Sequence, residues 1–173
     1  MITIQRPGQT NLEIEFILID FEGTLASDRR VHPKAKDKIN LLSKRTKIYI
    51  LVNPPIPPFN KGGEGGILAK EEKERVEEAL RKVKAEIKYL TQGESSQSKL
   101  DLLRRLGPSK TVAIGNGADD VSMIEEAGLG ICVFGKEGTF SEAMKKANVV
   151  FMNILDALDF LLKPLRQKAT LGK

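Results

Sequence analysis

The sequence contains no tryptophan, one cysteine, one histidine and only two tyrosines in 173 residues. Few aromatic side chains leave little stacking surface for single-stranded nucleic acid, so no nucleic-acid partner is expected. A lone Cys132 cannot form a disulfide within the chain, and nothing indicates an oxidising compartment. No signal-like segment and no run of about 18 apolar residues is present, so we expect a cytoplasmic protein without a membrane partner.

Length and charge limit the function further. The chain is long enough, at 40% hydrophobic residues, to build one core, and we expect a single domain over residues 1–173. The 28 Lys and Arg exceed the 23 Asp and Glu and give a net charge of +5, spread along helices instead of one basic run. This modest excess favours small anionic ligands.

Apolar runs of strand length alternate with segments of helical periodicity. Strands are expected at residues 2–5, 12–20, 47–52, 86–90, 111–116, 129–134 and 148–151, the first two as an N-terminal β-hairpin. Helices are expected at residues 33–43, 70–83, 96–107, 120–128, 140–147 and 154–163. Such alternation predicts an α/β, three-layer, Rossmann-like fold with a mostly parallel sheet, which binds ligands at the carboxyl ends of its strands.

Residues 53–67, NPPIPPFNKGGEGGI, interrupt this alternation. They hold four of the eight prolines and four of the fifteen glycines, and they show neither helical nor strand periodicity. We interpret them as a Pro/Gly-rich inserted loop. A polyproline ligand for a partner domain is the alternative, although no spaced proline motif with flanking basic residues is present.

Polar residues gather at the expected strand ends. Asp20 ends one central strand, residues 115–120 (GNGADD) follow another, and Lys99 lies in the helix before it. Singly, each has an ordinary explanation as a turn former, a helix cap or a solvated lysine. Together, the carboxylates suit a hard cation such as Mg²⁺, Lys99 offsets the charge of an anionic intermediate, and the Gly23-Thr24 turn offers N–H groups to a phosphate.

The stretches DFEGTLAS (20–27) and VAIGNGADDVSMIEEAGLGICVFG (112–135) resemble the first and fourth motifs of the haloacid dehalogenase (HAD) superfamily of aspartate-nucleophile phosphohydrolases. The resemblance extends over nearly the whole chain except about residues 53–69. In particular, the chain is similar to small, soluble proteins related to the catalytic domain of P-type ATPases.

This resemblance implies roles for the first and third motifs. Asp20 would be the nucleophile that forms an aspartyl-phosphate, and also a Mg²⁺ ligand. Glu22, where the family usually has Asp, would bind the metal through its main-chain carbonyl and act as the general acid and base. Gly23, Thr24 and Lys99 would bind the phosphate.

The fourth motif would complete the metal site, and the second motif departs from the family. Asp120 matches the metal ligand, while Asn116 and Asp119 stand where many relatives have the two residue types exchanged; we include all three as metal ligands. Val52 occupies the place expected for a phosphate-binding Ser or Thr. Asn53 could substitute if the strand end is shifted by one residue.

No cap domain fits between the motifs, so the site is expected to be open, and small-molecule specificity would need a neighbouring subunit in a homo-oligomer. The sequence predicts a Mg²⁺-dependent phosphohydrolase, a phosphomonoesterase or ATPase-like enzyme, that acts on a phosphorylated substrate through Asp20. The alternative is a catalytically impaired relative that binds a metal, a phosphate ligand or a protein partner. Glu22 and Val52 keep this alternative open.

Overall fold

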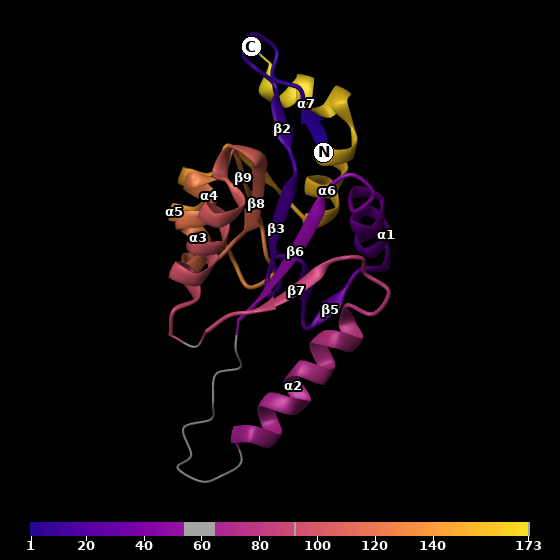
Figure 1. Cartoon of the computed structure of the whole chain (residues 1–173), viewed down its shortest axis with the longest axis vertical. Helices are drawn as coiled ribbons and strands as arrows, with labels where there is room; N and C mark the ends of the chain where they lie inside the picture. The colour runs from indigo at the N-terminus through magenta and orange to yellow at the C-terminus, as the bar shows by residue number, and fades with distance from the viewer. Residues whose placement is uncertain (54–64, 92, 173) are drawn as a thin grey trace.

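The computed structural model describes residues 1–53, 65–91 and 93–172 (Figure 1). Its centre is a six-stranded sheet in the order β10-β9-β8-β3-β6-β7, in which every neighbouring pair is parallel. The strands are β3 (Phe16–Asp20), β6 (Lys47–Val52), β7 (Glu86–Tyr89), β8 (Thr111–Gly115), β9 (Leu129–Val133) and β10 (Val149–Phe151). The predicted α/β fold with a mostly parallel sheet is confirmed.

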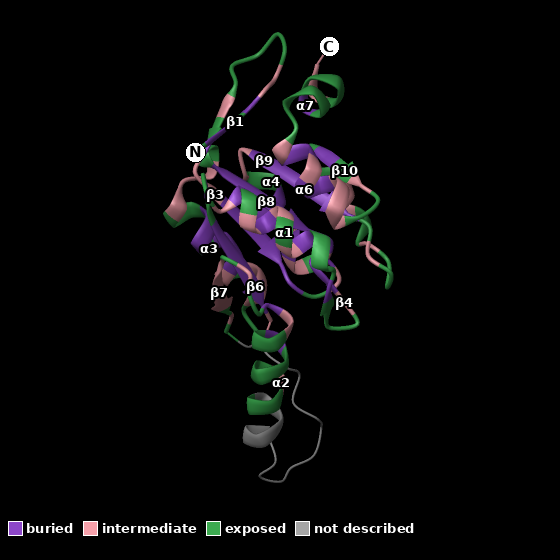
Figure 2. Ribbon diagram, turned by 90° about the vertical axis from the view of Figure 1, so that its right-hand side faces the viewer, coloured by how far each residue is buried: buried purple, intermediate pink, exposed green. Residues whose placement is uncertain are grey.

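Helices cover both faces of this sheet (Figures 1 and 2). On one face lie α1 (Pro33–Leu42) and α6 (Ile154–Leu162), whose apolar residues share a core cluster with β3. On the other lie α3 (Ser95–Leu106), α4 (Val121–Glu126) and α5 (Ser141–Lys146), with their own clusters. The short 3-10 helices Pro108–Lys110 and Ala118–Asp120 flank β8. The predicted three layers are therefore present.

Burial on both faces explains the sequence of β3. Ile17, Leu18 and Ile19 are all fully buried, because one helical layer packs on each side of the central strand. A strand covered on both faces needs a continuous apolar run instead of alternation, and this run ends at Asp20. The first polar residue therefore emerges at the carboxyl edge.

The N-terminal hairpin is also confirmed, with one correction. β1 (Ile2–Ile4) and β2 (Leu12–Ile14) pair antiparallel in a small separate sheet. The expected strand over 12–20 is divided at Glu15, whose N–H donates to the Lys110 carbonyl and whose carbonyl accepts from the Lys47 N–H. These bonds turn the chain from the hairpin into the main sheet.

The helix expected at 70–83 is shifted toward the N-terminus. α2 spans Gly65–Ala79, so residues 65–67 of the expected loop are helical. Lys82, in the expected last turn, has a positive φ of 67°, which an α-helix does not accommodate. Most of the expected loop, residues 54–64, lies outside the described residues.

Two short strands and one α-helix were not expected from the sequence. β4 (Ala26–Ser27) and β5 (Arg30–Val31) form a hairpin whose two turn residues, Asp28 and Arg29, have φ of 51° and 60°. Such left-handed values suit a tight hairpin turn, although neither residue is glycine. α7 (Pro164–Leu171) follows the expected helix at 154–163 and starts with a proline, which is favoured at a first helical position.

The described segments that connect β3, β6 and β7 are too short to contain a cap domain. Between β3 and β6 lie only the β4–β5 hairpin and α1, and the described part between β6 and β7 holds only α2. Over residues 1–53, 65–91 and 93–172 there is therefore no cap domain, as predicted. No helix in these ranges is both long and apolar enough to cross a membrane.

Gln167 joins the two ends of the chain. Its side chain is buried, its Oε1 accepts from the Gln5 N–H at 3.0 Å, and its Nε2 donates to the carbonyls of Phe160 (2.9 Å) and Leu161 (3.3 Å). One side chain thus ties α7 to both the N-terminal hairpin and α6.

We expect Gln167→Ala to lower the free energy of unfolding by about 1–3 kcal/mol, because it leaves buried main-chain groups without partners. Gln97→Ala is the matched control, since the Gln97 side chain donates only to the exposed Asp101 and its loss should cost no more than about 0.5 kcal/mol. Urea unfolding followed by circular dichroism measures both. Equal losses would show that Gln167 is not a structural tie.

Candidate active site

Three parallel strands end side by side at one edge of the sheet. β3 lies between β6 and β8, and Asp20, the last residue of β3, is in register with Leu51 of β6. Asn53 follows the end of β6, and Gly115 ends β8. Because parallel strands bring their carboxyl ends to the same edge, the polar residues of these strand ends meet there.

Lys99 reaches into this edge from α3 and contacts three carboxylates. Its Nζ lies 2.7 Å from an oxygen of each of Asp20, Asp119 and Asp120. Lys99 and Asp120 are fully buried, Asp20 is 3% exposed, and Asp119 is half-buried. An ammonium group has three N–H donors, and each finds a carboxylate oxygen here. We call these four residues the Lys99 cluster; the sequence predicted all of them at this edge.

The Lys99 cluster holds more carboxylates than ammonium groups, and burial shifts the pKa values of its members. Burial, and then the charge of Asp120, raises the pKa of Asp20 well above its ordinary value against the opposing effect of Lys99. Burial likewise raises the pKa of Asp120. Burial alone would lower the pKa of Lys99, but the three carboxylates outweigh it and raise that pKa. For Asp119, Lys99 outweighs burial and lowers the pKa. Three carboxylates and one ammonium leave an excess of negative charge at a buried site.

The turn after β8 is built around Asp120. Its Oδ2 accepts from the main-chain N–H groups of Asn116 and Gly117, both at 2.9 Å, while its Oδ1 faces Lys99. A Cβ on Gly115 would lie 2.4 Å from the Asp120 Cγ, so no side chain fits there. The GNGADD sequence thus fixes one carboxylate in a single orientation.

Asn116 holds two loops together beside the Lys99 cluster. Its Oδ1 accepts from the Thr24 hydroxyl at 3.1 Å, and its Nδ2 donates to the carbonyls of Gly23 (3.1 Å) and Gly138 (3.4 Å). Both ends of the amide are therefore occupied by protein groups. Its predicted role as a metal ligand stays a prediction, whereas a role in positioning the Gly23-Thr24 turn follows from these contacts.

The main chain of this turn differs in detail from the expectation. Gly23, with φ of +73°, donates its N–H to the Ala26 carbonyl at 3.0 Å, so that donor is already used. No acceptor is recorded for the N–H of Glu22 or Thr24 among the described residues. These two N–H groups are therefore the better candidates for contacting a bound anion.

The end of β6 resolves which residue faces the site. Side chains alternate along β6, so that Tyr49 and Leu51 lie in the cluster with α3, while Val52 lies in the core cluster with α1 and α6. The Asn53 side chain returns to the α3 side, where its Nδ2 donates to Asp119 Oδ2 at 3.0 Å. Asn53 therefore faces the site and Val52 does not, as the one-residue shift allows; the phosphate-binding role of Asn53 stays a prediction.

Glu22 lies outside the Lys99 cluster. Its side chain is exposed, and no described residue forms a hydrogen bond or ion pair with it. Neighbouring atoms still remove part of its hydration and raise its pKa; Arg29 opposes this change, and Glu72 and Glu137 add to it. Asp20 and Glu22 are therefore not an equivalent pair of carboxylates.

Sequence reasoning missed one contributor to the site. The turn from Gly135 to Gly138 closes against Asn116, and the Phe140 N–H donates to the Asn116 carbonyl at 2.9 Å. A Cβ on Gly135 would lie 2.7 Å from the Gly23 carbonyl, so this turn packs directly on the first motif. In the sequence, the signal for this turn was the pair Gly135 and Gly138 on either side of two charged residues.

Sequence similarity provides the first comparison with known proteins. No family model matches the chain. The uncharacterized protein MJ0073 of Methanocaldococcus jannaschii is 44% identical over 72 residues, which cover 41% of this chain and 77% of that protein.

Solved structures provide the second comparison. The 3-deoxy-D-manno-octulosonate 8-phosphate phosphatase of Moraxella catarrhalis, in complex with magnesium, phosphate and KDO, superposes with a TM-score of 0.61 at 14% identity, over 87% of each chain. The Yersinia pestis enzyme of the same name gives 0.61 at 15% identity, over 92% of this chain and 85% of that one. The cobalt-bound Haemophilus influenzae phosphatase gives 0.56 at 15% identity, over 93% and 91%. The chain therefore has the HAD fold.

The raised pKa of Asp20 predicts a pH-dependent stability. Because the folded protein favours neutral Asp20, this residue contributes fully to the free energy of unfolding below the ordinary aspartate pKa. That contribution is lost as the pH rises through the raised pKa of Asp20. With a chelator at neutral pH, we expect Asp20→Asn to raise the free energy of unfolding by about 1 kcal/mol or more. This gain should shrink toward zero near about pH 4.

Thermal unfolding followed by circular dichroism at several pH values measures this difference. Asp37→Asn, at an exposed position of α1, is the matched control and should change stability little at any pH. A loss of stability in Asp20→Asn at neutral pH would contradict an excess of buried negative charge.

Proposed function

We propose that this chain, which belongs to the same family as MJ0073 and has the HAD fold, is a magnesium-dependent phosphohydrolase. The single observation that carries the proposal is the Lys99 cluster at the carboxyl edge of the sheet. A nucleophile, an anion-stabilising cation and further carboxylates stand together there, in the order that the HAD motifs imply. The phosphatases with which the chain superposes support the same reaction class.

The residues at this site fit a divalent cation. Asp20, Asp119 and Asp120 each offer a carboxylate oxygen, and these oxygens lie within 4.8 Å of one another. Oxygen donors with surplus negative charge suit Mg²⁺. Asn53 Oδ1 is buried without a donor among the described residues, as expected of an acceptor beside a hydrated ion. Mg²⁺, when bound, would withdraw charge from phosphate oxygens.

Asp20 is proposed as the nucleophile. Lys99 donates to its Oδ1, and no described residue donates to its Oδ2, which is therefore free to attack. Oδ2 bonds to phosphorus while the bond from phosphorus to the leaving oxygen breaks, and Glu22 supplies the proton for that oxygen. Water then attacks the phosphorus of the aspartyl-phosphate, and Glu22 accepts a proton from this water. The bond between phosphorus and Asp20 Oδ2 breaks, so that inorganic phosphate is released and Asp20 is regenerated.

The remaining polar groups are proposed to bind the phosphate. Lys99 contacts the Asp20 carboxylate, and Asn53 contacts the neighbouring Asp119. The main-chain N–H groups of Glu22 and Thr24 lie in the turn that follows Asp20. The metal ligands would be the three aspartates together with the main-chain carbonyl of Glu22. With no cap over the described chain, the substrate is a phosphorylated molecule that enters an open site.

We expect the protein to hydrolyse p-nitrophenyl phosphate with Mg²⁺ and to lose this activity with a chelator. Asp20→Asn should lower turnover at least about 10³-fold, because the nucleophile is lost. Asp37→Asn, exposed on α1, is the control with unchanged turnover. Absence of activity in the wild type, or activity unchanged by Asp20→Asn, would instead favour a binding protein that has lost catalysis.

The position of Asn53 makes a separate prediction. Asn53→Ala should lower turnover by about 10- to 150-fold, the equivalent of one lost charge-assisted hydrogen bond. Asn53→Ser should recover part of the loss, because a hydroxyl can still donate.

Val52→Thr is the matched control for Asn53, since it places a hydroxyl one residue earlier and into the core. It should leave turnover unchanged and lower the melting temperature, because the hydroxyl is buried among apolar side chains. A clear gain of turnover in Val52→Thr would place the phosphate-binding position at 52.

A further inference from the structure

A second hollow lies between the edge of the sheet and α3, away from the Lys99 cluster. It has a volume of about 690 Å³, within the range of about 300–1,000 Å³ typical of small-molecule sites. We call it the Arg105 groove. Its lining includes Tyr49, Lys88, Leu90, Ser98, Leu102 and Arg105. None of the four residues of the Lys99 cluster lines it.

Sheet topology explains why this groove exists. β7 is the edge strand, and Lys88 is in register with Leu51, so its side chain lies on the same face as Tyr49. On this face α3 covers β6, whereas Lys88 is only half-buried. The groove is therefore a strip of sheet that the described helices leave partly open, with α3 as one wall.

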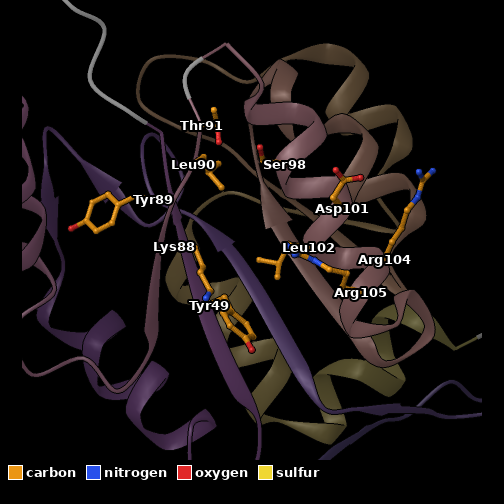
Figure 3. A pocket seen from close by; sticks show the side chains of 10 residues that line it. All are labelled: Tyr49, Lys88, Tyr89, Leu90, Thr91, Ser98, Asp101, Leu102, Arg104 and Arg105. Atoms are coloured by element: carbon orange, nitrogen blue, oxygen red, sulfur yellow. The ribbon is translucent and has the colours of Figure 1, made fainter.

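Cationic groups converge on the floor of the groove. Figure 3 shows the Lys88 side chain running from β7 toward Tyr49, and the Arg105 side chain extending from α3 toward the sheet. The ammonium groups of Lys47 and Lys88 lie 5.0 and 5.8 Å from the centre of the Tyr49 ring. Cation–π contacts with one buried ring thus hold both lysines near the floor.

Acidic residues do not cancel this charge. Glu86 pairs with both Lys47 (3.1 Å) and Lys88 (2.5 Å), so one carboxylate serves two lysines. No ion pair of Arg105 is recorded in the described parts of the chain. The acidic lining residue Asp101 already accepts a hydrogen bond from Gln97 at 2.7 Å.

The neighbouring arginine provides a contrast. Arg104, which also lines the groove, extends away from Arg105 in Figure 3 and pairs with Glu126 at 2.5 Å. Two consecutive arginines of α3 are therefore used differently: one closes an ion pair on the helix surface, and Arg105 is turned toward the sheet.

We propose that the Arg105 groove binds a small organic anion. Its acid group would lie between Lys88 and Arg105, and its carbon skeleton would pack on Leu90 and Leu102. The Ser98 hydroxyl, on the same wall, is a further hydrogen-bond partner. This binding does not depend on the proposed phosphohydrolase activity.

The groove is also connected to the catalytic edge through the main chain. Ser98 directly precedes Lys99 on α3, and the Leu90 N–H donates to the Val52 carbonyl at 2.9 Å, next to Asn53. A ligand in the groove would touch both elements that carry site residues.

The test uses phenylacetate as the anion and phenylacetamide as the uncharged probe of the same shape. Leucine methyl groups are followed by NMR in the full-length protein, so that the reading is independent of turnover. We expect phenylacetate to shift the methyl signals of Leu90 and Leu102, and phenylacetamide to bind at least about tenfold more weakly.

Substitutions of two arginines test where phenylacetate binds. Arg105→Gln should weaken phenylacetate binding about tenfold, Arg105→Lys should restore part of it, and Arg166→Gln should leave it unchanged. Arg166 is the matched control because it is an exposed arginine on α7, which pairs with Asp156. Melting temperatures of the variants verify that each is folded.

Three results would overturn the proposal. These are equal binding of the uncharged amide, shifts confined to methyl groups elsewhere, and undiminished binding in Arg105→Gln. Sedimentation provides a further check. If the wild type self-associates, Arg105→Gln abolishes this and phenylacetate does not bind, the groove is an interface between copies and not an anion site.

Discussion

The buried ammonium of Lys99 is the interaction on which the site depends. A lysine with no exposed surface is stable only when its donors are matched, and here the lysine and its three acceptors come from three different parts of the chain. Asp20 ends β3, Lys99 projects from α3, and Asp119 and Asp120 follow β8. The ion cluster therefore fixes the helix, the central strand and the GNGADD turn relative to one another.

The same cluster is incomplete as an isolated structure. One ammonium does not neutralise three carboxylates, and the raised pKa values of Asp20 and Asp120 show that burial works against their charged forms. A purely structural ion pair would be expected to balance its charges. Residual negative charge at a strand edge is instead a feature of a site that receives a cation, and active sites commonly sacrifice stability in this way.

Much of this site could be predicted from the sequence. A continuous apolar run that ends in Asp20 has to be a buried strand, and alternating elements place its end beside the GNGADD turn. The choice between Val52 and Asn53 could not be settled, because a shift of one residue reverses the face of a strand. The β4–β5 hairpin is too short for periodicity to reveal it, and α7 begins with a proline, which is as typical of a helix end as of a helix start. The Arg105 groove depends on which sheet edge α3 leaves open, which no local pattern records.

Chemical trapping of an aspartyl-phosphate tests whether Asp20 is the nucleophile. The protein is mixed with p-nitrophenyl phosphate and Mg²⁺, quenched in acid during turnover, reduced with borohydride and digested for mass spectrometry. An aspartyl-phosphate is reduced to homoserine, so we expect homoserine at position 20 and at no other aspartate. Phosphate release without homoserine at position 20, or with homoserine at position 119 or 120, would contradict it.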